Sequence, residues 1–192
     1  IYLNQASLGL LSDETVNEMT EFLSTVARYG NLKMTDREEA NFLNPLRGKV
    51  ARLVQAKQKN IALVSSASEI LSQIPELCKP RIRSNVILVS TDFPAITRPW
   101  LLKAKTSDFE VCFIHEVPET DLSNAIIEKV DSNTSVVCLS YVQFASGTQI
   151  NVEKLSQYTK EVGAKLVIDV TQAAGAVPIS INDWAVDILV CS

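Results

Sequence analysis

The segment Leu166–Asp169 places a carboxylate at the end of an apolar run, where chemistry is easiest to recognise. Burying a carboxylate is costly unless it is paired, and a cationic ring nitrogen is one partner that offsets the desolvation. The alternative is that Asp169 caps the next turn through the backbone amides of Thr171 and Gln172. The residues alone leave these two interpretations level.

Small hydroxyl residues follow a second apolar run. Val64 precedes Ser65-Ser66-Ala67-Ser68-Glu69, where we expect a helix to begin. Free backbone amides at a helix start, together with serine hydroxyls, make an anion site suited to phosphate. A pattern this short by itself favours the alternative, that one serine is only the helix cap.

Two further segments end at polar or aromatic residues. Phe93 follows Ser90-Thr91-Asp92 and could stack on an aromatic cofactor, although an aromatic residue at such a place more often packs in the core. The last apolar run, Asp187–Ser192, delivers another hydroxyl. Taken alone, Phe93 is expected in the core.

Short β-branched runs alternating with amphipathic segments are expected to position these residues. The expected strands are 60–65, 85–90, 109–115, 135–140, 165–169 and 186–191, and the expected helices include 12–27, 36–56 and 152–162. Apolar strands separated by helices predict a parallel sheet covered on both faces, a three-layer α/β/α domain. Ligands bind beyond the carboxyl ends of such strands, where all four segments end.

The composition limits the partners. The chain has 192 residues, of which 46% are hydrophobic and 21% charged, enough for a sizeable core. The net charge of −4, with no Lys/Arg block, favours neither nucleic acid nor a membrane surface. No apolar stretch approaches the roughly 20 residues needed to span a bilayer. We expect a small-molecule partner, an arm and helix over 1–30, and a larger domain over 31–192.

Scattered cysteines indicate the compartment. Cys78, Cys112, Cys138 and Cys191 form no CxxC motif, which is typical of buried thiols in a reducing environment, so a cytoplasmic location is predicted. Cys112 and the single histidine, His115, fall short of the three or four ligands of a zinc site. No metal is expected.

In this order, the segments resemble the class V aminotransferase family, which includes cysteine desulfurases, kynureninases and isopenicillin N epimerase-like enzymes. The resemblance runs over essentially the whole chain. Its most specific part is Asp169-x-x-Gln172 after an apolar strand, followed by Asp187 and a strand ending at Ser192. It implies a pyridoxal 5'-phosphate (PLP) enzyme of fold type I, a homodimer, and a smaller C-terminal domain beyond this stretch.

The resemblance also assigns residues to the cofactor. It implies that Ser66, Ala67 and Ser68 bind the phosphate and that Phe93 stacks on the ring. It implies that Asp169 pairs with the pyridine nitrogen and keeps it protonated.

The remaining matches place further residues around the ring and the substrate. Thr171 matches the residue on the other face of the ring, and Gln172 the one near its phenolic oxygen. Ser192 matches a phosphate contact that precedes the Schiff-base lysine by a few residues. Gln143 matches a loop residue at the cofactor, and Asn4 and Ala6 match the segment that lines the substrate pocket.

The implied function is chemistry at the α-carbon or amine of an amino acid, by transamination, epimerisation or elimination. Gln143 and Phe144 stand where desulfurases have Ser and Asn, which disfavours desulfuration. Without the lysine, the 192 residues alone are expected to be inactive.

There are two alternatives to this function. A nucleotide-binding enzyme is disfavoured because the six glycines supply neither GxGxxG nor GxxxxGK[ST]. A non-catalytic binding or scaffold protein that kept the fold and lost the lysine stays open.

Overall fold

A computed structural model describes all residues, 1–192. The chain forms two compact units, Ile1–Val50 and Ala51–Ser192, and each is described by itself. The boundary expected after residue 30 lies within the first unit and stays a prediction about domain organisation.

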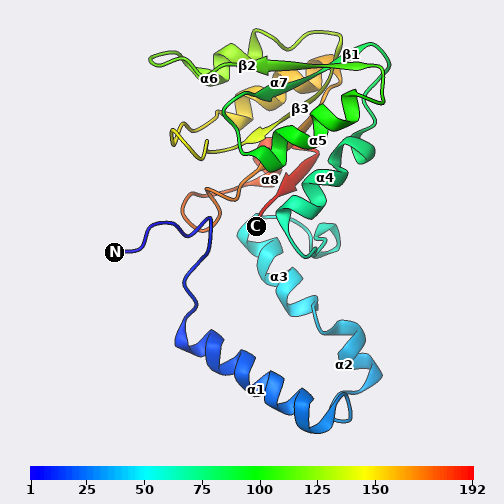
Figure 1. Cartoon of the computed structure of the whole chain (residues 1–192), viewed down its shortest axis with the longest axis vertical. Coiled ribbons are helices and arrows are strands. Elements are labelled where there is room, and N and C mark those ends of the chain that lie inside the picture. Colours follow the sequence, from blue (N-terminus) through cyan, green and yellow to red (C-terminus); the bar gives the residue numbers. More distant parts are fainter. The chain divides into compact units, whose positions relative to one another are not determined.

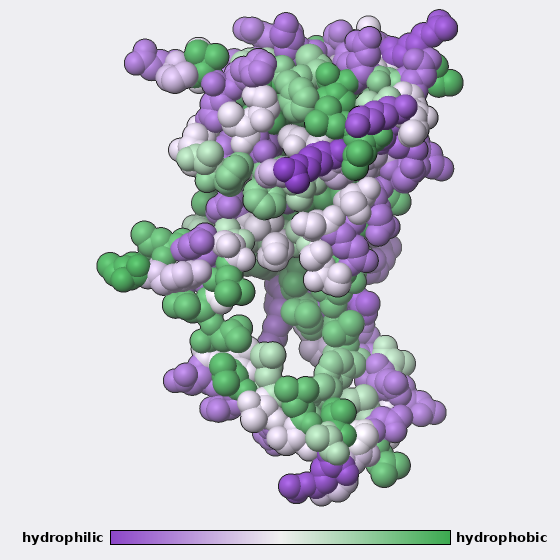
Figure 2. Space-filling model, viewed as in Figure 1, coloured by the Kyte–Doolittle hydropathy of each residue, from purple (hydrophilic) through white to green (hydrophobic).

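The first unit carries helices α1 (Asp13–Tyr29) and α2 (Asp36–Asn41) and most of α3 (Asn44–Leu53). Ser12 caps α1 by accepting a hydrogen bond from the Thr15 amide at 3.2 Å. Neither α1 nor α2 buries a residue, and apolar side chains stay exposed along this unit (Figure 2).

The single helix expected over 36–56 is wrong, because the structure has two. Thr35 and Glu38 form a capping box at the start of α2, which ends at Asn41. Pro45 lies in the first turn of α3, the position where a residue without an N–H is tolerated. A continuous helix would have needed that amide, so a new helix begins there.

The second unit alternates strands and helices (Figure 1). Its elements are η1 (Gln58–Asn60), α4 (Ala67–Cys78), β1 (Ser84–Val89), α5 (Pro94–Ala104), β2 (Phe109–Ile114), α6 (Leu122–Ile127), β3 (Thr134–Ser140), α7 (Val152–Val162), β4 (Lys165–Asp169), α8 (Ile181–Trp184) and β5 (Ile188–Val190). All four strand pairings are parallel, and the strand order is β2-β1-β3-β4-β5.

Side chains of the sheet alternate between two cores, as period two requires. In β1, Val86 and Leu88 pack with α4 and α5, whereas Ile87 and Val89 pack with α6, α7 and α8. The predicted three-layer α/β/α architecture is therefore confirmed (Figure 1).

The strand expected over 60–65 is wrong. The structure has the short turn η1, followed by residues that pair with no strand. The segment is apolar and β-branched, but Val64 is exposed. Strand propensity depends on packing against neighbouring strands, and this segment has none.

The strand order creates a switch point between β1 and β3. The chain leaves β1 through α5 to reach β2 on one side, and returns through α6 to β3 on the other side. In open α/β sheets, ligands bind in the crevice at the carboxyl ends of two such strands.

Every helix of the chain is too short or too polar to span a bilayer.

Candidate functional site

Three adjacent strand ends are linked at the switch point. Asp169, the last residue of β4, pairs in register with Ser140, the last residue of β3. Asp92, just beyond β1, accepts hydrogen bonds from both the amide and the hydroxyl of Ser140, each at 2.7 Å. The carboxyl ends of β1, β3 and β4 therefore carry two carboxylates with one serine between them.

Asp169 is a buried carboxylate without a cation. It is 7% exposed, and neither of the chain's two ion pairs includes it. The Thr171 amide donates a hydrogen bond of 2.7 Å to its Oδ1. Burial raises the pKa of Asp169, the hydrogen bonds of Thr171 lower it, and the charge of Asp92 raises it further. The capping interpretation is thus confirmed for Thr171, and the carboxylate still lacks a charged partner.

The start of α4 shows how the serines are used. Ser66 caps the helix, its Oγ accepting from the Glu69 amide at 3.1 Å, so the predicted cap is confirmed. Glu69 turns back and accepts from the Ser65 hydroxyl and amide, and these hydrogen bonds lower the pKa of Glu69. The amides of Ala67 and Ser68 belong to the first turn, which has no intrahelical acceptors.

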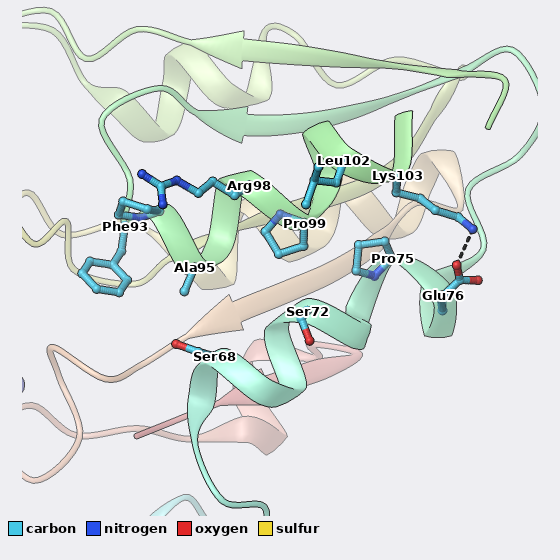
Figure 3. A pocket seen from close by; sticks show the side chains of 11 residues that line it. Ser68, Ser72, Pro75, Glu76, Phe93, Ala95, Arg98, Pro99, Leu102 and Lys103 are labelled. Carbon is cyan, nitrogen blue, oxygen red and sulfur yellow. Dashed lines mark hydrogen bonds and ion pairs between the residues drawn. The ribbon is translucent and has the colours of Figure 1, made fainter. Parts of the chain in front are cut away.

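An open groove of about 630 Å³ lies between α4 and α5. Figure 3 shows Ser68 and Phe93 near one end of it and the ion pair Glu76–Lys103 at the other. Its lining residues are Ser68, Ser72, Pro75, Glu76, Phe93, Pro94, Ala95, Arg98, Pro99, Leu102 and Lys103. The groove therefore opens beside the helix start that carries Ser68.

Phe93 is 49% exposed, so the core position that the residue type alone favours is wrong. Its ring meets that of Phe144 edge to face, with centroids 5.4 Å apart at 85°. Its amide donates to Oδ1 of Asp92 at 2.7 Å. An exposed ring held at a strand end is available to stack on a flat ligand.

Gln143 is 1% exposed and its amide is half satisfied. Its Nε2 donates to Asp92 Oδ2 and to the Ser140 carbonyl, each at 3.2 Å. Its Oε1 is buried without a hydrogen-bond partner. A buried acceptor without a hydrogen-bond partner is uncommon in folded proteins.

The other predicted site residues divide into two groups. Thr171 accepts a hydrogen bond of 3.0 Å from the Ser192 amide, so the ends of β4 and β5 meet, and Gln172 beside them is exposed. Asn4 and Ala6 belong to the unit 1–50, where the Asn4 carbonyl accepts from two amides of the following turn. Their role at a substrate pocket stays a prediction.

Asp92 is the residue that the sequence analysis missed. It is 4% exposed and receives four hydrogen bonds, more than any neighbouring side chain of the site. The signal that identified Asp169, a carboxylate directly after an apolar run, is weaker here, because Ser90 and Thr91 separate Asp92 from the last apolar residue of β1, Val89. Its importance depends on donors that are distant in the sequence, Ser140 and Gln143.

The outer edge of the site carries a polar cluster. His115 Nδ1 lies 3.0 Å from the Ser90 hydroxyl. Glu116 accepts hydrogen bonds from Thr91, at 3.3 Å, and from Thr148, which lower its pKa. No group of three or more His, Cys, Asp or Glu side chains could hold a metal ion.

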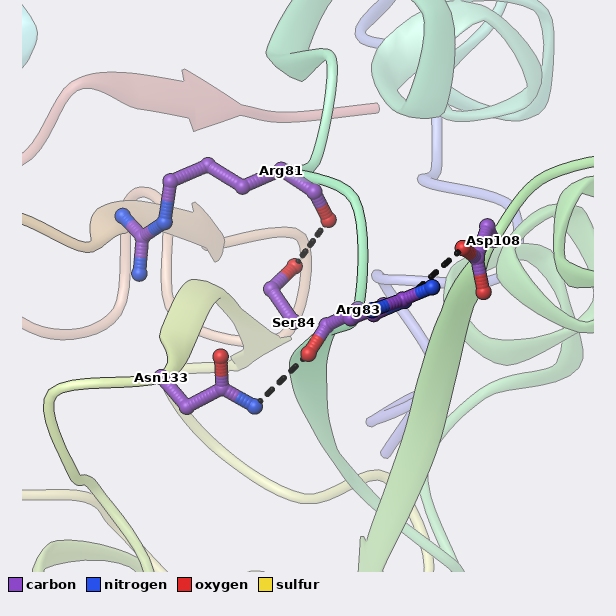
Figure 4. A network of polar contacts seen from close by, with 5 residues as sticks. All are labelled: Arg81, Arg83, Ser84, Asp108 and Asn133. Carbon is purple, nitrogen blue, oxygen red and sulfur yellow. Dashed lines mark hydrogen bonds and ion pairs between the residues drawn. The ribbon is translucent and has the colours of Figure 1, made fainter.

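The opposite edge of the sheet carries a network that joins strand starts (Figure 4). Ser84 donates to the Arg81 carbonyl at 2.6 Å, and Asn133 donates to the Arg83 carbonyl at 2.9 Å. Arg83 also lies 3.8 Å from Asp108, both side chains being exposed. An exposed ion pair of this kind contributes little to stability. The hydrogen bonds of Ser84 and Asn133 instead hold the loops that lead into β1 and β3.

Comparison with known proteins gives the family. The model of the family Aminotransferase class-V matches residues 1–192. The uncharacterized aminotransferase YcbU of Bacillus subtilis is 24% identical over 74% of this chain and 38% of its own length. The kynureninase of Lodderomyces elongisporus is 24% identical over 97% of this chain and 44% of its own. A probable cysteine desulfurase of Pyrococcus abyssi is 27% identical over 74% of this chain and 36% of its own.

Solved structures share the fold over the whole chain. An apo cysteine desulfurase from Thermococcus onnurineus superimposes with a TM-score of 0.83 at 23% identity, and this chain covers 49% of it. The lyase C-DES, as a mutant with glycine covalently linked to its PLP cofactor, gives 0.87 at 14% identity and 52% coverage. The chain spans about half the length of these structures and less than half that of the curated relatives. Matched by the family model over its full length, it belongs to the PLP-dependent class V aminotransferase family.

Proposed function

We propose that this chain is the cofactor-binding half of a PLP enzyme that acts on the α-carbon or the amine of an amino acid. One observation carries the proposal. Asp169 is a buried carboxylate at the carboxyl edge of the sheet, with one backbone donor and no cation. A protonated pyridine nitrogen is a partner that would offset the cost of its burial.

The other residues present fit the same cofactor. The first-turn amides of Ala67 and Ser68, with the Ser68 hydroxyl, would hold the phosphate at the start of α4. Ser66 would contribute by fixing that helix start, since its own hydroxyl oxygen already accepts from Glu69. Phe93 would stack on the ring. Thr171 and Ser192, joined by their 3.0 Å hydrogen bond, would close the site beside Asp169, with Gln172 exposed next to them.

The chemistry depends on the electron sink that PLP supplies when bound. The carboxylate of Asp169, which has no cationic partner in the chain, would accept a hydrogen bond from the pyridine nitrogen and so keep that nitrogen protonated. Phe93 would orient the ring plane, and the helix amides would anchor the phosphate end. Transamination, epimerisation or elimination would then be selected by residues beyond this stretch.

The test uses the full-length product of the natural gene. It is incubated with PLP, reduced with borohydride, and digested, and the modified lysine is located by peptide mass mapping. We expect one labelled lysine a few residues beyond Ser192. The eleven lysines of the chain itself are expected to remain unmodified.

Two results would count against the proposal. Labelling scattered over surface lysines would show that PLP has no defined site here. Absence of labelling, with PLP still bound reversibly, would favour a non-catalytic protein that kept the fold.

Two finer proposals concern the whole protein. The exposed apolar side chains of α1 support a homodimer, and the scattered cysteines support a cytoplasmic location. Light scattering of the full-length protein tests the first, and localisation of a tagged protein tests the second.

A further inference from the structure

Two buried carboxylates at the switch point differ in how many donors they hold. Asp92 Oδ1 accepts from the Phe93 amide and the Ser140 hydroxyl, each at 2.7 Å. Its Oδ2 accepts from the Ser140 amide at 2.7 Å and from Gln143 Nε2 at 3.2 Å. A carboxylate offers about four lone-pair sites, so Asp92 is filled by its own chain, whereas Asp169 has donors from Thr171 alone.

We propose that Asp92 is a positioning residue of the candidate site, which fixes Phe93 in the place from which it would stack on the cofactor and ties Gln143, in the loop after β3, to the end of β1. This proposal rests on the proposed function. Asp92 has no site left for a ligand, so it acts through the residues that it binds.

The first of these residues is Phe93. Phe93 is the N-cap residue of α5, and its side chain makes no capping hydrogen bond. Its amide lies at the helix start, where backbone N–H groups have no acceptor within the helix. The hydrogen bond to Asp92 fixes this amide beside the end of β1. This hydrogen bond therefore fixes the backbone at Phe93, whose side chain is half exposed and whose ring contacts that of Phe144.

The second residue is Gln143. The two ends of a glutamine amide are nearly equal in shape, and the hydrogen-bond partners decide which end is which. Asp92 and the Ser140 carbonyl both accept, so they select Nε2. The buried Oε1 is left as an empty acceptor. The orientation of the Gln143 amide, and with it the path of the loop after β3, is therefore set by Asp92 and the Ser140 carbonyl.

The fold places this arrangement at the switch point. Asp92 follows β1. Ser140 is the last residue of β3, and Gln143 lies in the loop after it. The order in which the parallel strands are added to the sheet reverses between β1 and β3. A carboxylate that bridges them joins two strand ends that no short loop connects.

The test measures PLP binding by full-length protein carrying Asp92→Asn. The new Nδ2 takes the place of one carboxylate oxygen and therefore faces two donors. At the Oδ2 position it opposes the Ser140 amide and Gln143, and at the Oδ1 position it opposes the Phe93 amide and the Ser140 hydroxyl, so in either orientation one tie between β1 and β3 is lost. We expect the dissociation constant of PLP to rise about tenfold, the loss of a charged hydrogen bond. We also expect a changed visible circular dichroism band of bound PLP.

Asp131→Asn is the matched control. Asp131 accepts from the Asn85 side chain, the Asn133 amide and the Thr134 hydroxyl at the amino ends of the strands. Its loss should lower the melting temperature and leave PLP affinity unchanged.

The outcomes separate this proposal from the proposed function. Wild-type protein that fails to bind PLP overturns both. Wild-type binding with unchanged affinity and dichroism in Asp92→Asn overturns the positioning role alone, as does equal weakening in Asp131→Asn. If Asp92→Asn does not fold, Ser140→Ala, which removes one donor and keeps the charge, should weaken PLP binding about two- to threefold. Unchanged affinity there overturns the role.

Discussion

At the scale of single residues, the two buried carboxylates of the candidate site differ in how many hydrogen-bond donors they have. Asp92 is filled by four donors of its own chain, and Asp169 keeps its charge nearly unpaired in a buried place. An uncompensated buried charge costs stability, and such costs are concentrated where a protein prepares to bind a charged partner.

Asp169→Asn should therefore stabilise the apoprotein at neutral pH. Burial raises the pKa of Asp169 above its ordinary 3.8, so the folded state favours the proton. That contribution is present below pH 3.8 and is lost as pH rises through the raised pKa. We expect Asp169→Asn to melt on the order of 2–4 °C higher at pH 7, the shift that about 1 kcal/mol gives at this size.

Thermal unfolding followed by circular dichroism between pH 4 and 8 measures this difference, which should shrink toward the acid end. The same variant should bind PLP less tightly. A variant that melts lower than the wild type at pH 7 would contradict the account of an unpaired buried charge.

At the scale of elements, the start of α4 and the loop after β3 carry the polar groups of the site. Ser66 is committed to the helix cap, whereas Ser68, two residues later, is exposed at the groove. In the loop after β3, the hydroxyl of Thr148 donates a hydrogen bond to Glu116, which follows β2. The helix cap and the proposed ligand contact thus belong to two different serines, Ser66 and Ser68.

Substituting the two serines should separate these tasks. Ser66→Ala removes the acceptor of the Glu69 amide and should lower the free energy of unfolding by about 1 kcal/mol. Ser68→Ala should leave stability within about 0.5 kcal/mol and weaken PLP binding. Urea unfolding and PLP titration of both variants provide the comparison, and equal effects of the two on stability would argue against it.

The hold of Glu116 on the loop should depend on pH. The hydrogen bonds from Thr148 and its neighbours lower the pKa of Glu116 from 4.5, so their contribution is present above pH 4.5 and is lost as pH falls through the lowered value. Hydrogen exchange at residues 143–148, corrected for intrinsic rates, should accelerate in that acid range. Glu116→Gln should remove this pH dependence, and its persistence in the variant would exclude Glu116 as the cause.

At the scale of the whole molecule, the two units differ in how they use apolar residues. The unit 51–192 buries two cores against its sheet, whereas α1 exposes an apolar stripe that includes Val16, Met19, Leu23 and Val26. Their spacing of three and four residues puts them on one helix face. Exposed apolar stripes of this kind mark surfaces that associate.

The 192-residue chain should therefore self-associate as its concentration rises. Met19→Lys with Val26→Lys places charges on the stripe and should shift the chain toward the monomer, as measured by size-exclusion chromatography with light scattering. Asn17→Lys with Ser24→Lys adds the same charge on the opposite face of α1 and serves as the control. Equal shifts in both pairs would mean that net charge, and not the stripe, governs association.

The sequence by itself determined most of the elements and the edge of the sheet at which the candidate site lies. The bounds of α7 and β4 were predicted to the residue, because periodicity and caps are local properties. The parallel sheet followed from apolar strands alternating with helices, and Asp169 from a carboxylate at a strand end.

Only the tertiary structure decided the rest. Residues 60–65 have the residue types of a strand but no neighbouring strand to pair with, and Phe93 is an aromatic residue that the core does not cover. The part of Asp92 could not be seen along the chain, because its donors Ser140 and Gln143 lie 48 and 51 residues away. Pairing between distant residues is set by the strand order, which brings the ends of β1 and β3 together.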